Sequence, residues 1–177
     1  MHLTNFKFIK QMISFCKHQS FLLFSLWVLL ASFSLSAQTQ IGGNIIGEQI
    51  SDKSGSSVSM SGNGTRIAIG APTNNGSGIW NSSWGHVRIY DYNGSAWVQV
   101  GADIDGEAAG DESGHSVSLS SDGSIVAIGA TNNDAGNSNS DNRGHVRIYQ
   151  YSGGSWTQLG SDIDGEYAGD YLSLIHI

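Results

Sequence analysis

Residues 114–130 read GHSVSLSSDGSIVAIGA, and residues 55–71 read GSSVSMSGNGTRIAIGA. The first half of each stretch alternates small polar and apolar residues, which is the period of a half-buried β-strand. Turn residues follow, SSDGS in one copy and SGNGT in the other. The next run is short, apolar and rich in isoleucine, as in a strand buried on both faces. Each stretch therefore predicts a β-hairpin.

The two hairpins belong to a longer internal repeat of 59 residues. Residues 41–99 and 100–158, compared without gaps, are identical at 27 of 59 positions. A third copy begins at 159, so residues 38–171 hold about 2.4 units, which start near 41, 100 and 159. A period of this size indicates a repeat architecture in which each unit is one supersecondary structure.

One unit predicts four short strands, at 116–120, 125–128, 144–149 and 156–159, and no amphipathic helix. Four antiparallel strands make one blade of a β-propeller, so we expect an all-β fold built from such blades. Antiparallel order places the loops at 72–84 and 131–143 on one face, together with the links between units. The short turns lie on the opposite face.

The two long loops differ in sequence, although the strands around them match. Variable loops on a constant scaffold are typical of binding surfaces. Trp80 and Trp84 in the first loop have two interpretations. They form a stacking platform for sugar rings or a protein partner, or they fold back to cover their own blade.

The amino-terminal segment has the features of a secretory signal peptide. Residues 21–33 read FLLFSLWVLLASF, with Lys7, Lys10 and Lys17 before them and Ser34-Leu-Ser-Ala37 after them. This apolar run is shorter than the roughly 20 residues of a spanning helix. We therefore predict a signal peptide at 1–37 and a secreted or cell-surface bacterial protein with no membrane insertion after cleavage. An uncleaved anchor is the alternative.

Charge and cysteine content restrict the remaining chain further. Residues 38–177 carry 5 basic and 15 acidic residues, a balance that argues against nucleic-acid binding. The single cysteine, Cys16, lies in the predicted leader, so no disulfide is expected in the mature chain.

The repeated motifs resemble a known family. GSSVS at 55–59 followed by AIGAP at 68–72, and GHSVS at 114–118 with AIGA at 127–130, resemble the FG-GAP repeats of integrin-α-type β-propellers. The resemblance covers 41–170 and implies a fragment of a seven-bladed propeller used in adhesion or ligand binding. Ser54 and Ser113 replace the phenylalanine of the family motif. The turns between the first two strands are too short for the family's calcium loop, so that site is not carried over.

A second acidic pattern is a hypothetical calcium site. Asp103, Asp105, Glu107 and Asp111 surround Gly106, and the next unit repeats them as Asp162, Asp164, Glu166 and Asp170. Hard cations need several oxygen ligands from one turning loop, which this spacing can supply. The alternative is an outer strand end with solvated acids. We assign no metal ligand and no cofactor-binding residue.

No set of catalytic residues is found. His86 and His145 occupy the same place in two units, whereas a catalytic residue is normally unique, so we predict strand-edge or hydrogen-bonding roles. His115 has no counterpart but also no nucleophile beside it. We expect a non-enzymatic module that binds a protein or a glycan. The alternative is a propeller hydrolase or lyase whose catalytic residues lie in other blades.

The last residues, 172–177, depart from the repeat. Asp111 is followed by ESGHSVS, but its counterpart Asp170 is followed by YLSLIHI. We predict a tail at 172–177 that results from a truncation or a frameshift.

Overall fold

The computed structural model describes residues 38–76, 82–134 and 141–173. The chain divides into two compact units, Met1–Gln40 and Ile41–Ile177, and the description below concerns the second. The predicted signal peptide, Trp80 and most of the predicted tail lie outside the described residues. Within the described ranges, no helix has the length and apolar character needed to cross a membrane.

The described residues form ten strands and no helix, which confirms the all-β prediction. The first five are β1 (Ser57–Met60), β2 (Arg66–Ala71), β3 (His86–Tyr92), β4 (Trp97–Gln99) and β5 (Ile104–Asp105). The other five are β6 (Ser113–Leu119), β7 (Ile125–Ala130), β8 (His145–Ser152), β9 (Ser155–Gln158) and β10 (Ile163–Asp164).

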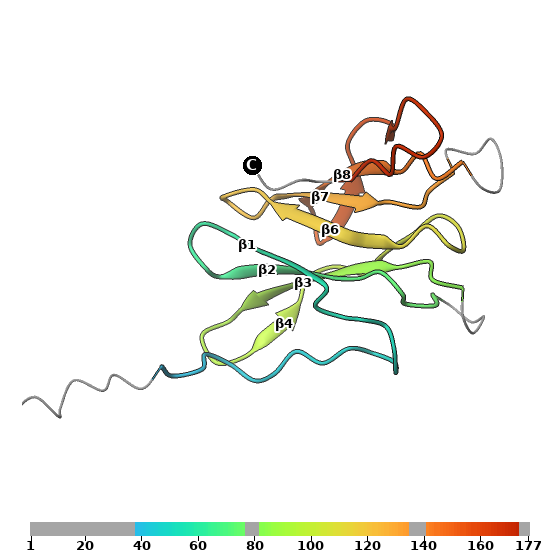
Figure 1. Ribbon diagram of the computed structural model, residues 1–177. Coiled ribbons are helices and arrows are strands. Elements are labelled where there is room, and N and C mark those ends of the chain that lie inside the picture. The colour runs from blue at the N-terminus through green and yellow to red at the C-terminus, as the bar shows by residue number, and fades with distance from the viewer. Residues whose placement is uncertain (1–37, 77–81, 135–140, 174–177) are drawn as a thin grey trace, which may run out of the picture. The chain divides into compact units, whose positions relative to one another are not determined.

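The strands form two antiparallel sheets (Figure 1), and each sheet includes one short strand, β5 or β10, from the first residues of the next repeat unit. In the first sheet the order is β1-β2-β3-β4, and β5 also pairs with β3. The second sheet repeats this as β6-β7-β8, with β9 and β10 both paired to β8. We call these two sheets, with their turns, blade 1 and blade 2.

A side-chain cap closes each predicted hairpin turn. Asn63 Oδ1 accepts a hydrogen bond from Thr65 N at 3.0 Å, and Asp122 Oδ1 accepts one from Ser124 N at 3.0 Å. These are the Asx turns that short polar side chains favour. Hydrogen bonds, first of all from Ser120, lower the pKa of Asp122 to about 2. The turn therefore selects the charged form of this carboxylate.

The outer edge of each sheet consists of two short strands, of which the first matches the predicted fourth strand at 156–159 and the second is additional. In blade 1, β4 pairs with the end of β3 and β5 with its beginning. Gly101 lies between these two strands with a φ of 75°, and a Cβ there would lie 2.7 Å from Trp156 Cδ1 of blade 2. The indole of Trp156 also donates to Val100 O at 2.9 Å. The break between the two strands thus makes room for the tryptophan of the next blade.

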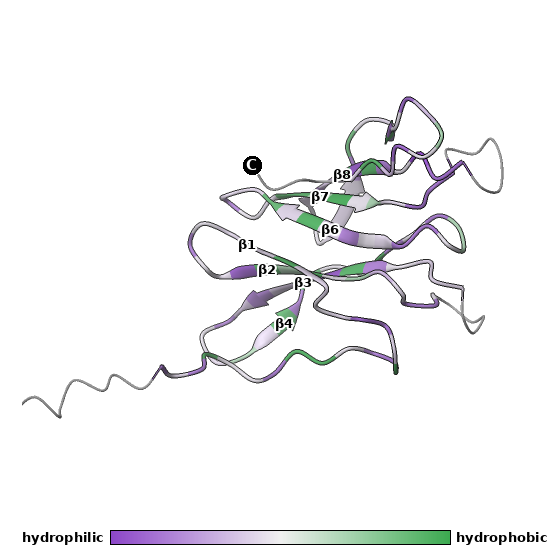
Figure 2. Ribbon diagram, in the orientation of Figure 1, coloured by the Kyte–Doolittle hydropathy of each residue, from purple (hydrophilic) through white to green (hydrophobic). Residues whose placement is uncertain are grey.

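The main hydrophobic core lies where the two sheets pack together. Its buried side chains come from both blades: Ala68, Val87, Ile89, Ile104, Val117, Val126, Ile128 and Tyr149. Figure 2 shows the apolar residues on β6 and β7 that contribute to it. Burial of this apolar surface is the main favourable term for packing one blade on the other.

Each long loop lies beside the link that leads to the next unit. Gly110 N donates to Ser82 O at 2.7 Å and Ser113 N donates to Trp84 O at 3.0 Å. In the second unit, Gly169 N donates to Asp141 O and Leu172 N to Arg143 O in the same register. Leu172, the first residue of the predicted tail, therefore keeps the place that Ser113 has in the repeat.

Candidate functional site

An arginine of each blade holds the backbone of the chain segment that comes before that blade. Arg88 on β3 donates from Nη2 to Ile46 O at 2.9 Å, and Arg147 on β8 donates to Asp105 O at 2.8 Å. Ile46 and Asp105 are one repeat apart, as are the two arginines. The contact between the segment before β1 and blade 1 is thus equivalent to the contact between the end of blade 1 and blade 2.

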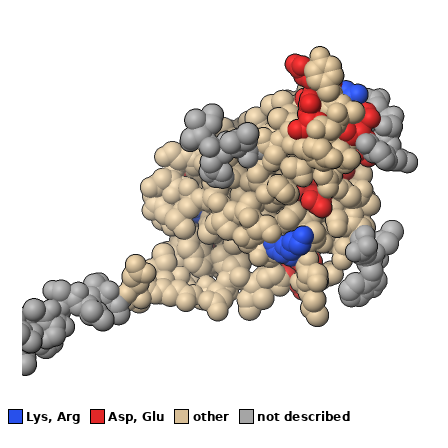
Figure 3. Space-filling model, in the orientation of Figure 1, with Lys and Arg blue, Asp and Glu red and all other residues tan. Residues whose placement is uncertain are grey.

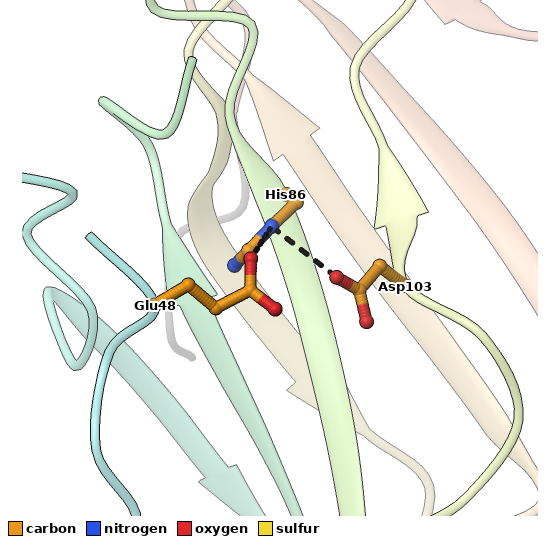
Figure 4. A group of neighbouring side chains, drawn as sticks. All are labelled: Glu48, His86 and Asp103. Carbon is orange, nitrogen blue, oxygen red and sulfur yellow. Dashed lines mark ion pairs between the residues drawn. The ribbon is translucent and has the colours of Figure 1, made fainter. Parts of the chain in front are cut away.

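A histidine and two carboxylates come together at this junction (Figure 4). His86 is the first residue of β3, Glu48 lies in the segment before β1, and Asp103 directly precedes β5. His86 Nδ1 lies 3.9 Å from Glu48 Oε2 and 3.7 Å from Asp103 Oδ2. Both distances are too long for a hydrogen bond.

The second unit reproduces the same arrangement. His145 Nδ1 lies 3.9 Å from Glu107 Oε2 and 3.7 Å from Asp162 Oδ2. Glu107 lies in the link that follows β5 of blade 1, whereas His145 is the first residue of β8 and Asp162 directly precedes β10, both strands of blade 2. We call Glu48, His86 and Asp103 cluster 1, and Glu107, His145 and Asp162 cluster 2. In each cluster the candidate ligand atoms all lie within 4.8 Å of one another.

Both histidines are buried, each with 1% of its surface exposed. Neither ring nitrogen of His145 has a hydrogen-bond partner, and His86 Nε2 also lacks one. A buried polar atom without a partner costs about 1–3 kcal/mol. Of the two predicted roles, strand edge or hydrogen bonding, the structure shows no hydrogen bond to the ring of His145, because the nearest carboxylates stop short of bonding distance. Both histidines are the first residues of their strands.

Burial keeps the ring of cluster 2 neutral. Desolvation, followed by the positive charge of Arg147, lowers the pKa of His145 below its usual value. The neutral imidazole retains a nitrogen lone pair, which is the form that ligates metal ions.

The same arginines orient the glutamates of the clusters. Arg88 Nη1 lies 3.5 Å from Glu48 Oε1, and Arg147 Nη1 lies 3.3 Å from Glu107 Oε1. The other oxygen of each carboxylate faces the histidine. Two carboxylates and one guanidinium give each cluster a net negative charge.

The structure separates the residues of the hypothetical calcium site. Asp103 lies in cluster 1 and Glu107 in cluster 2, while the side chain of Asp105 is exposed. Asp111 is buried and accepts hydrogen bonds from Asn133 Nδ2 and Ala108 N, both at 3.0 Å. These four carboxylates therefore do not surround a single ion.

The third copy of the pattern is divided in the same way. Asp162 lies in cluster 2, and Asp170 accepts a hydrogen bond from Tyr167 N at 2.8 Å. Asp164 and Glu166 are exposed. Over 38–76, 82–134 and 141–173, clusters 1 and 2 are the groups of three ligand residues close enough to share an ion.

The sequence reasoning missed these clusters because it compared acids within one unit. The sequence does contain a signal. Glu48, His86 and Asp103 each recur 59 residues later, as Glu107, His145 and Asp162.

The other singled-out residues lie elsewhere. His115 is exposed on β6. Trp84 is half-buried and lies over Gly76 of its own loop, where a Cβ would be 3.5 Å from the indole Cγ. This contact agrees with the interpretation that Trp84 covers its own blade.

Comparison with known proteins gives no family for this chain. No family model matches it. No curated protein matches it either.

Proposed function

We propose that this chain is part of a secreted or cell-surface β-propeller of the FG-GAP type, which binds a protein or a glycan and catalyses no reaction. The binding surface consists of the two long loops, 72–84 and 131–143, and the links beside them. The observation that carries the proposal is that both loops share the same anchor but differ in the residues beyond it.

The anchor is a buried aspartate–asparagine pair. Asn74 Nδ2 donates to Asp52 Oδ2 at 3.0 Å, and Asn133 Nδ2 donates to Asp111 Oδ2 at 3.0 Å. The backbone closes both loops in the same way, because Gly85 N donates to Asn74 O and Gly144 N to Asn133 O, each at 3.0 Å. A fixed base allows the exposed part of a loop to vary without disturbing the blade.

The exposed faces of the two blades support a longer propeller. Val58 is 48% exposed, whereas its counterpart Val117 is fully buried between the blades. Ile163 is 51% exposed, whereas its counterpart Ile104 is 6% exposed. The exposed face of blade 1 is therefore equivalent to the face of blade 2 that packs on blade 1. The exposed face of blade 2 is equivalent to the face of blade 1 that packs on blade 2. Further blades of the same kind cover both faces in the proposed propeller.

The charge of the surface agrees with an extracellular protein or glycan ligand. On the face drawn in Figure 3, acidic side chains gather over the part of the chain that Figure 1 draws in orange and red. That part contains Asp162, Asp164, Glu166 and Asp170. Such a surface repels the phosphate backbone of nucleic acids.

Exchanging one loop for the other tests the proposal. The variant replaces residues 75–83 by the sequence of 134–142, which has the same length. The full chain is applied to a glycan array and to immobilised collagen, fibronectin and laminin. We expect the intact chain to bind at least one of these surfaces. The loop exchange should weaken that binding about tenfold or more, because contacts at an interface centre carry most of the affinity.

The matched control is Asp122→Asn, on the opposite face. Asn63 occupies this place in blade 1 and makes the equivalent turn bonds, so the control variant should bind as the intact chain does. The proposal fails if no surface is bound, or if the loop exchange and the control weaken binding equally. Hydrolysis of an arrayed glycan by the intact chain would favour the hydrolase alternative.

A further inference from the structure

Clusters 1 and 2 each place one imidazole nitrogen and two carboxylate oxygens around a common point. We propose that each cluster binds one divalent transition-metal cation, best represented by Zn²⁺, and that the ion joins a repeat unit to the blade that follows it. Each chain of this length would hold two ions. The three ligands of each ion come from three separate segments of the chain. A bound ion therefore stabilises the packing of these segments on one another.

The spacing of the ligand atoms is close to that of a zinc site. Zinc bonds to nitrogen and oxygen measure about 2.0–2.2 Å, which separates tetrahedral ligand atoms by about 3.4 Å. In both clusters the histidine Nδ1 lies 3.7 Å from the aspartate oxygen and 3.9 Å from the glutamate oxygen. A shift of a few tenths of an ångström closes this difference. Glu48 and Glu107 can make that shift, because their side chains are 42% and 46% exposed.

An ion in cluster 2 would also satisfy one buried nitrogen that has no hydrogen-bond partner. His145 Nδ1 faces the two carboxylates of cluster 2 and has no other partner. A metal ion accepts its lone pair and at the same time bridges the gap to both oxygens. The exposed side of the glutamate leaves space for water as a fourth ligand, as in zinc sites with three protein ligands.

The ligand types favour a transition metal over calcium. Imidazole suits Zn²⁺ and similar ions, whereas Ca²⁺ takes six to eight oxygen ligands. Each cluster contributes only two carboxylates. Arg88 and Arg147 hold the far oxygen of each glutamate, in the way that residues around a metal site commonly orient its ligands.

The position of cluster 2 gives the ion a structural consequence. Glu107 lies in the link after β5 of blade 1, whereas His145 begins β8 and Asp162 directly precedes β10 in blade 2. A bound ion therefore links blade 1 to blade 2 in addition to their hydrophobic contact. Cluster 1 makes the same link between the segment that carries Glu48 and blade 1.

Zinc titration of the full chain, prepared without a metal-binding tag, tests the proposal. Calorimetry should show two high-affinity sites per chain, and Zn²⁺ at about 100 times Kd should raise the thermal midpoint by about 10 °C or more. His86→Ala and His145→Ala should each remove one site, and the double variant should remove both. His115→Ala, which changes an exposed histidine outside the clusters, should retain two. Ca²⁺ at the same concentration should leave the midpoint unchanged.

If a histidine variant does not fold, the variant Glu107→Gln provides a second test of the proposal. This side chain is partly exposed, so the variant should fold and bind Zn²⁺ about tenfold more weakly at one site only. The proposal is overturned if the intact chain binds no Zn²⁺. Water would then occupy the space between the histidine and the two carboxylates. Unchanged stoichiometry in the double histidine variant overturns the proposal too, as does stabilisation by Ca²⁺ equal to that by Zn²⁺.

Discussion

We expect Gly70→Ala to lower the free energy of unfolding by about 3 kcal/mol or more in urea denaturation of the full chain. Gly70 lies in β2, where a Cβ would collide with Gly114 O of blade 2 and with Ser57 Oγ. Ser57 Oγ donates to that same carbonyl at 2.8 Å. An added methyl group therefore displaces a hydrogen bond and pushes the blades apart where their backbones meet.

Gly43→Ala is the matched control, because a Cβ at Gly43 meets no atom within 4 Å. Neither glycine has a positive φ, so backbone strain does not distinguish the two variants, whereas the space around the new methyl group does. Removing a glycine from open backbone restricts the unfolded chain and stabilises by about 0.4–1 kcal/mol. The account of the blade contact is wrong if Gly70→Ala is as stable as Gly43→Ala.

Asp111→Ala should cost about 2–4 kcal/mol of unfolding free energy. The carboxylate is 4% exposed and accepts hydrogen bonds from Asn133 Nδ2 and Ala108 N. Alanine removes the acceptor of one buried hydrogen bond, from Asn133 Nδ2, and of one part-buried hydrogen bond, from Ala108 N, and the loss of an acceptor at a buried donor costs about 1–3 kcal/mol. The loop at 131–143 also loses its anchor, so amide exchange should accelerate at Gly144, which donates to Asn133 O.

Asp105→Ala serves as the comparison for this variant. Asp105 carries the same charge, but its side chain is exposed and only its backbone oxygen accepts a hydrogen bond from Arg147. Its loss should change stability by less than about 0.5 kcal/mol. Equal costs for Asp105→Ala and Asp111→Ala would show that the buried aspartate does not anchor the loop.

The strand pattern and the repeat were predictable from sequence because both depend on local rules. The alternation at 116–120 and the turn at Asp122 specify a hairpin without reference to the rest of the chain. The 59-residue period then predicts that each unit repeats this structure. The position of the loops beside the links followed from antiparallel order alone.

The division of the outer edge into two short strands was not predictable within one unit. It depends on Trp156, which packs over Gly101 of the preceding blade. A positive-φ glycine and a tryptophan 55 residues later have no visible relation in the sequence until the blades are stacked.

The His–carboxylate clusters were missed for a similar reason. The recurrence of His86 and His145 favours a structural role. The acidic pattern from Asp103 to Asp111 fits either one cation-binding loop or an outer strand end with solvated acids. In the structure, Asp103 instead lies beside Glu48, which precedes blade 1, and Glu107 lies beside His145 of blade 2.

Anomalous diffraction at the zinc absorption edge, from crystals of the full chain grown with Zn²⁺, tests the central claim most directly. We predict two strong peaks per chain, one between His86, Glu48 and Asp103 and the other between His145, Glu107 and Asp162. Each peak should lie about 2.0–2.2 Å from its ligand atoms. Well-ordered clusters without an anomalous peak, or zinc bound only at other residues, would contradict the account.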